Sequence, residues 1–132
     1  MQAQIVNSKT VTGVVGEFRA VSGNVGALGQ VAQSTAATEA VIGVAQYAGV
    51  ALDNVRVVTW GPTKAIAGAA LTSAAAGDYQ LMVDAQGRFI PWVGGGGPDH
   101  AVAIWSPSTA QPTAAVDEQI TIIFTGFTGH RA

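Results

Sequence analysis

The sequence predicts an all-β fold, a compact β-barrel or a tulip-like β sandwich, built from two similar β units with at most one short helix. Val (17 residues) and Ile (8) far outnumber Leu (4), and 12 Thr add to this excess of β-branched side chains, which favour strands. Apolar and polar positions alternate in several segments, and the same landmarks recur in both halves of the chain. A length of 132 residues suits one domain.

The amino-terminal segment, residues 1–12, alternates weakly and carries one charge, on Lys9. It is either an edge strand of the domain or an arm that adds to a neighbour's sheet. The single β domain then spans residues 13–132. Thr35 to Glu39 could form one helical turn, but no capping pattern predicts a longer helix.

Alternation marks residues 55–59 as a strand, with Arg56 on the face opposite Val55 and Val57. Asp84 to Gly87 is a tight turn, because Asp can bond its own backbone and Gly tolerates positive φ. Residues 79–83 and 88–91 therefore form a hairpin.

The last strand is predicted over residues 120–125. Ile120, Ile122 and Phe124 share one face, and Ile123 on the other face indicates that the second side is also covered.

Two stretches of about 60 residues read alike, with their landmarks in the same order. The matched segments are 16–21 with 77–82, 42–45 with 100–103, and 51–58 with 115–123. We predict two pseudo-repeats, about 13–62 and 63–127, that together close one core. The alternative is that two halves of a sequence rich in Ala, Gly and Val resemble each other by chance.

The charge pattern excludes several functions. Six Lys and Arg are spread singly against eight acids, so no basic stripe predicts direct binding to nucleic acid. Disulfides are excluded because there is no Cys. The amino end does not resemble a signal peptide, and the uncharged apolar stretches, Ala40 to Leu52 and Ala65 to Gly77, are too short to span a membrane. We expect a soluble chain whose low charge, 11% of residues, suits contact with neighbours.

Candidate chemistry is sparse. Asp99 and His100 with Ser106 or Ser108 have the residue types of a hydrolytic triad, but no Gly-x-Ser-x-Gly motif accompanies them. Asp99, His100 and His130 make a weak ligand set for a metal. Gly94 to Gly97 lacks the Lys-Ser/Thr of a phosphate-binding loop. We therefore expect no catalytic residue, metal site or cofactor, and a protein that is not an enzyme.

The three Trp residues either fill the interior or anchor a partner. Trp92 is favoured for the partner because it adjoins the four-glycine segment. The candidate contacts with a capsid or a neighbouring subunit are Gln2, Gln4, Ile5, Val6, Trp92 and Trp105.

Several segments resemble a known family. They are Ala65–Thr72, Ala76–Tyr79, Val83–Pro91, Ala101–Ala103 and Asp117–Phe124. Their order resembles that of the small capsid decoration (head cement) proteins of tailed bacteriophages, in which a Gly-Asp turn, a short strand, a turn ending in Gly and a basic residue, and a Val-Ala strand precede the last strand. The likeness covers residues 10 to 126, and the chain departs from it in the longer segments 93–98 and 105–113.

The resemblance implies a structural virion protein on the outer surface of the capsid that cements neighbouring major capsid subunits. It further implies a homo-oligomer, a trimer at local threefold positions, with the major capsid protein as partner, assembled in the host cytoplasm, without cofactor, membrane or direct nucleic-acid contact. The alternative from the residues alone is a β-sandwich adhesion or carbohydrate-binding module that uses exposed Trp or Tyr as stacking platforms.

Overall fold

The fold is all-β, as predicted, in a computed structural model that describes residues 4–23, 30–36, 38–92 and 101–126. Within these residues one 3₁₀ helix is found, η1 (Ala76–Asp78). The strands are β1 (Ile5–Val11), β2 (Ala20–Gly23), β3 (Gln30–Gln33), β4 (Val41–Ala45), β5 (Asn54–Ile66), β6 (Leu71–Thr72), β7 (Gln80–Val83), β8 (Phe89–Pro91), β9 (Ala103–Trp105), β10 (Thr113–Ala114) and β11 (Gln119–Phe124). No helix in the described part of the chain is long and apolar enough to cross a membrane.

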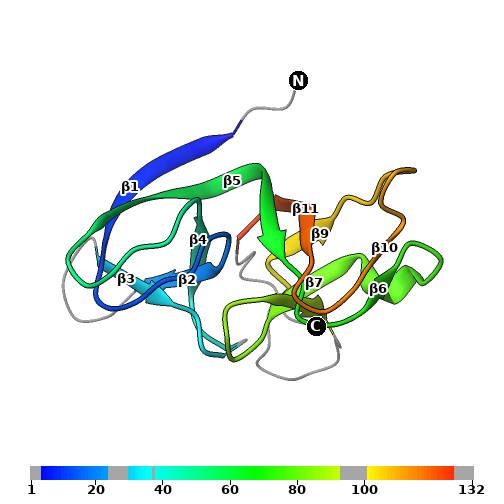
Figure 1. Cartoon of the computed structure of the whole chain (residues 1–132), viewed down its shortest axis with the longest axis horizontal. Helices are drawn as coiled ribbons and strands as arrows, with labels where there is room; N and C mark the ends of the chain where they lie inside the picture. Colours follow the sequence, from blue (N-terminus) through cyan, green and yellow to red (C-terminus); the bar gives the residue numbers. More distant parts are fainter. Residues whose placement is uncertain (1–3, 24–29, 37, 93–100, 127–132) are drawn as a thin grey trace.

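Barrel 1 is formed by β1, β3, β2, β4 and the first half of β5, in that order (Figure 1). The sheet closes on itself because β1 pairs antiparallel with β5, from Ile5 opposite Trp60 to Thr10 opposite Asn54. Residues 5–11 are therefore a strand of this domain, and the first of the two sequence alternatives holds for them.

Barrel 2 starts from the second half of β5, which pairs with β11 and is followed in the sheet by β9, β7 and β8. A parallel bridge between Ala67 and Phe89 brings β8 back to the end of β5. The 13 residues of β5 thus belong to both barrels, and a division of the chain at residues 62 and 63 falls inside this strand (Figure 1).

The two barrels have matching strand registers. Val44 lies opposite Val58 in barrel 1, as Ile104 lies opposite Ile123 in barrel 2. Each barrel also closes with a parallel contact, Val11 with Val31 in the first and Ala67 with Phe89 in the second.

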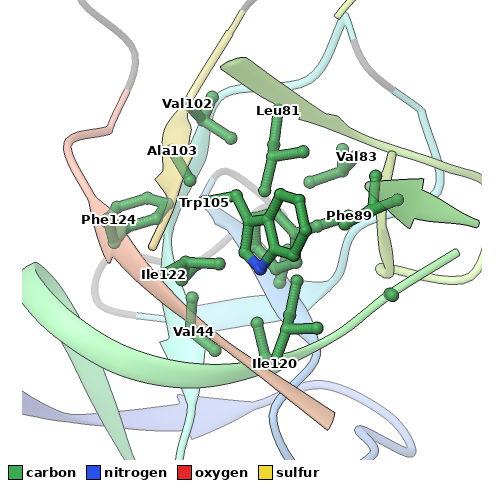
Figure 2. Close-up of a cluster of buried hydrophobic side chains, with 14 of the residues drawn as sticks. Val44, Leu81, Val83, Phe89, Val102, Ala103, Trp105, Ile120, Ile122 and Phe124 are labelled. Carbon is green, nitrogen blue, oxygen red and sulfur yellow. The ribbon is translucent and has the colours of Figure 1, made fainter. Parts of the chain in front are cut away.

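The core has two clusters of buried side chains. Valines of β1, β2, β3 and β5 fill barrel 1 together with Ala45. Larger side chains fill barrel 2, among them Leu81, Phe89, Trp105 and Phe124 (Figure 2). Ala20, Val41 and Val44, on β2 and β4, belong to this second cluster, so the outside of barrel 1 packs against barrel 2.

The predicted hairpin is confirmed, since β7 and β8 pair from Leu81 opposite Pro91 to Val83 opposite Phe89. Asp84 Oδ1 accepts hydrogen bonds from the N–H groups of Gln86 and Arg88, both at 2.9 Å, and Gly87 has a φ of +73°. The predicted strand over 55–59 lies in β5, and that over 120–125 corresponds to β11, which ends one residue earlier, at Phe124. In the segment 35–39 the described residues form a turn, with Glu39 N–H donating to Ala36 O over 3.2 Å.

Candidate interaction surface

The start of β1 carries an exposed apolar patch. Ile5 is 53% exposed and Val6 is 38% exposed, and the register of the strands places Ile5 beside Trp60 of β5. Gln4 Nε2 donates a hydrogen bond of 2.7 Å to Pro62 O and ties the beginning of the chain to β5. Of the amino-terminal candidates, Gln4, Ile5 and Val6 are therefore accessible, whereas Gln2 lies outside the described residues.

Trp60 is the exposed tryptophan that the candidate contacts omitted. Its side chain is 46% exposed, although tryptophan usually buries most of its large apolar surface. The alternation along β5 gives no signal for Trp60, because the pairing with β1 shifts register between Val58 and Trp60, and Val58, two residues after Arg56, is fully buried. We define the β1 patch as Ile5 and Trp60, which lie opposite each other, whereas Val6 lies opposite the buried Val58.

Trp105 corrects a sequence prediction. Its side chain is 1% exposed and lies inside barrel 2, with its ring centroid 5.9 Å from that of Tyr79 (Figure 2). The indole Nε1 is buried and has no hydrogen-bond partner. Trp105 therefore fills the core of barrel 2 and is not a contact for a partner. The matching register position in barrel 1 is occupied by Ala45, whose small side chain fills less of that barrel.

Trp92 is half-buried at the end of β8, where its backbone N–H donates to Gln80 O over 2.7 Å. Its role in binding a partner stays a prediction. The adjoining segment 93–100, which includes the four glycines, Asp99 and His100, lies outside the described residues, as does His130.

A second exposed apolar group lies at the end of barrel 1. Leu52 is 77% exposed, Val50 57% and Val14 76%. Reciprocal hydrogen bonds between Val15 and Gly49, at 2.9 and 3.0 Å, place the chain at Val14 next to the chain at Val50. We call Val14, Val50 and Leu52 the apolar tip.

One polar cluster lies beside a cavity of about 280 Å³, with Ser22 and Ser34 buried, Glu39 partly buried and Thr35 exposed. The hydroxyls of Ser22 and Ser34 are 2.6 Å apart, and Ser22 Oγ donates to Glu39 Oε1 over 2.8 Å. Thr35 donates to both carboxylate oxygens, from its N–H over 3.0 Å and its hydroxyl over 2.6 Å. Burial raises the pKa of Glu39, but these bonds outweigh it and leave the pKa below its ordinary value. A carboxylate so stabilised is a poor general base, and its hydrogen bonds hold Thr35 and Ser22 together.

The remaining polar candidates do not assemble a reactive site in the described structure. Ser108 Oγ accepts a hydrogen bond of 3.1 Å from Gln111 N–H, which is a turn contact. No three His, Cys, Asp or Glu side chains come together to hold a metal within residues 4–23, 30–36, 38–92 and 101–126.

Comparison with known proteins gives a match in structure only. No family model matches the sequence, and no curated protein is similar to it. Among solved structures, the chain is similar to the crystal structure of the head fiber gp8.5 N base of bacteriophage phi29, with a TM-score of 0.67. The likeness covers 97% of this chain and 100% of that chain at 14% sequence identity, and at this identity it establishes the fold.

Proposed function

We propose that this chain is a non-enzymatic structural protein of a bacteriophage virion. It binds the outer surface of the capsid and cements neighbouring major capsid subunits. The observation that carries the proposal is the end-to-end likeness of fold to the head fiber base of a phage. The resemblance of the sequence segments to head cement proteins supports the same class independently.

The surface of the described residues suits a lattice component. It presents two separate apolar groups, the β1 patch and the apolar tip, on a chain with only 11% charged residues. Apolar side chains exposed in groups favour contact with other proteins. Because a capsid repeats each binding site many times, modest single contacts add up to firm attachment.

The proposed assembly is a homotrimer at local threefold positions of the shell. Three copies would bring three apolar tips and three β1 patches to one site, and a trimer matches the threefold symmetry of such positions. Size-exclusion chromatography with light scattering measures the mass of the free assembly. A stable monomer that also binds heads as a monomer would contradict the trimer.

The test of the function is binding to heads purified from the phage that encodes the chain, grown without its gene. We expect the purified protein to co-sediment with these heads, to saturate at a fixed number of copies per head, and to raise their resistance to heating. Full and empty heads should bind equally, since the proposal involves no contact with DNA. Free protein that never associates with heads would refute the proposal, and retention on a glycan array, abolished by Trp60→Ala, would favour the carbohydrate-binding alternative.

A further inference from the structure

The apolar tip is held in a rigid frame of hydrogen bonds. Val50 N–H donates to Asp53 Oδ2 over 2.9 Å, and Asp53 N–H donates back to Val50 O over 3.0 Å. Two further bonds fix the turn to β1, from Leu52 N–H to Val11 O at 2.8 Å and from Val11 N–H to Asp53 O at 3.0 Å. The side chains of the tip are therefore presented by an ordered turn and lose little freedom when they bind.

Leu52 occupies a backbone conformation that disfavours leucine. Its φ is +73°, in the left-handed region, where a bulky side chain crowds the following carbonyl oxygen. Strained residues of this kind persist where the surrounding structure enforces them, and they gather at functional sites. Leu52 also gains almost nothing from burial, since its side chain is 77% exposed.

The matching turn of barrel 2 shows that the fold does not require an apolar residue at this position. Ala115 N–H donates to Glu118 Oε1 over 2.7 Å, as Val50 N–H does to Asp53. The residue with positive φ there is Asp117, at +70°, and its Oδ1 accepts a hydrogen bond of 2.9 Å from Arg88. Asp tolerates this conformation better than Leu. The hydrogen bonds of the turn therefore do not account for a leucine at this position in barrel 1.

We propose that the apolar tip docks into an apolar depression on the capsid subunits; this inference rests on the proposed function and assigns its contact surface. The turn between β4 and β5, which carries Val50 and Leu52, lies at one end of the long axis of the molecule (Figure 1), and Val14 belongs to the segment between β1 and β2. Its three exposed side chains are apolar and uncharged, so the tip suits an apolar site on a protein. Three side chains cover far less than the roughly 800 Å² per partner of a stable pair of copies, which favours one anchor among many in a lattice.

The test compares two substitutions that remove the leucine side chain and suit positive φ, Leu52→Asn and Leu52→Gly. The matched control is Val116→Ser, which removes a 51% exposed side chain from the corresponding turn of barrel 2. For each full-length variant, the thermal midpoint of the free protein and the half-saturating concentration on heads are measured. We expect both Leu52 variants to keep or raise the midpoint, because strain is relieved, and to need at least about tenfold more protein for half-saturation. The control should match the wild type in both measurements.

Several results would overturn this inference. Leu52 variants that bind heads like the wild type would exclude the tip as a contact while leaving the proposed function intact. A lower thermal midpoint in both variants would show that Leu52 acts through the fold. Variants that lose self-association, or binding to vesicles of phosphatidylcholine and phosphatidylglycerol, while still binding heads would assign the tip to a second copy or to a membrane. Failure of the wild type to bind heads would refute both the tip and the function.

Discussion

Gly43 on β4 is the position where one added methyl group should damage barrel 1 most. A Cβ built on Gly43 would collide with Cγ1 of Val57 and would lie 2.6 Å from the carbonyl oxygen of Val58. Both residues belong to β5, which pairs with β4 from Val44 opposite Val58 to Ala45 opposite Val57. Because one of the obstacles is backbone, a change of rotamer cannot relieve the clash of Gly43→Ala.

The expected cost is at the upper end of that measured for overpacked sites, about 3 kcal/mol, since the paired strands must separate. At about 2.1 cal/mol/K per residue, the unfolding entropy of a 132-residue chain is about 0.28 kcal/mol/K. Gly43→Ala should therefore lower the thermal midpoint by about 11 °C.

Thermal and urea unfolding followed by circular dichroism would measure this effect. Gly77→Ala is the matched control, because a Cβ at Gly77 would meet nothing within 4 Å, and it should change stability by less than about 0.5 kcal/mol. The urea m-value should be the same in both variants if only the native state changes. A midpoint for Gly43→Ala within 2 °C or so of the control would refute the reasoning that β4 and β5 are in closest approach at this glycine.

Two further predictions concern the tryptophans and the partly buried carboxylate of Glu39. Trp105→Ala should cost about 3–5 kcal/mol in urea unfolding because it empties barrel 2, whereas the exposed Trp60→Ala should cost less than about 1 kcal/mol; equal costs would contradict the assignment of one to the core and the other to the surface. Glu39 has a lowered pKa, since the hydrogen bonds from Thr35 and Ser22 outweigh the opposing effect of burial. Its ionised form therefore adds stability above the ordinary value of 4.5, and this contribution is lost as the pH falls through the folded pKa. Glu39→Gln should flatten the fall of the thermal midpoint below about pH 4.5, and parallel profiles for variant and wild type would contradict this role.

Local features of the fold could be predicted from the sequence because short-range chemistry specifies them. The hairpin of β7 and β8 follows from Asp84 and Gly87. The side-chain oxygen of Asp84 accepts the backbone hydrogen bonds of the turn, and Gly87 adopts the positive φ that the turn requires. The alternation in residues 120–125 similarly places the inward side chains of β11, whereas in β5 it places Val55 and Val57 and fails at Val58, which is also buried.

Closure of the barrels could not be predicted in this way. The pairing of β1 with β5 joins residues more than 40 positions apart, and no local pattern favours that partner over another strand. The same limit explains why the sequence likeness matched the two turns one residue out of register. The sequence likeness aligned Asp53 with Asp117, whereas the hydrogen bonds of the turns align Asp53 with Glu118, one residue later.

The candidate surface was predictable at its amino-terminal end and not at the tryptophans. Weak alternation predicts a strand without a fully buried face, and Ile5 and Val6 of β1 are both exposed. Trp105 was misassigned because its strand, β9, has only three residues. A strand of three residues is too short for alternation to separate an inner from an outer position. Leu52 gave no signal because leucine is not a residue type that marks a left-handed turn.

The sharing of β5 has a mechanical consequence. Two domains joined by a peptide linker can swing or be pulled apart while each stays folded. Here the first half of one continuous strand is hydrogen-bonded into barrel 1 and the second half into barrel 2. A load applied to one barrel passes to the other along a strand held by paired backbone groups, so the two barrels bear tension as one rigid body.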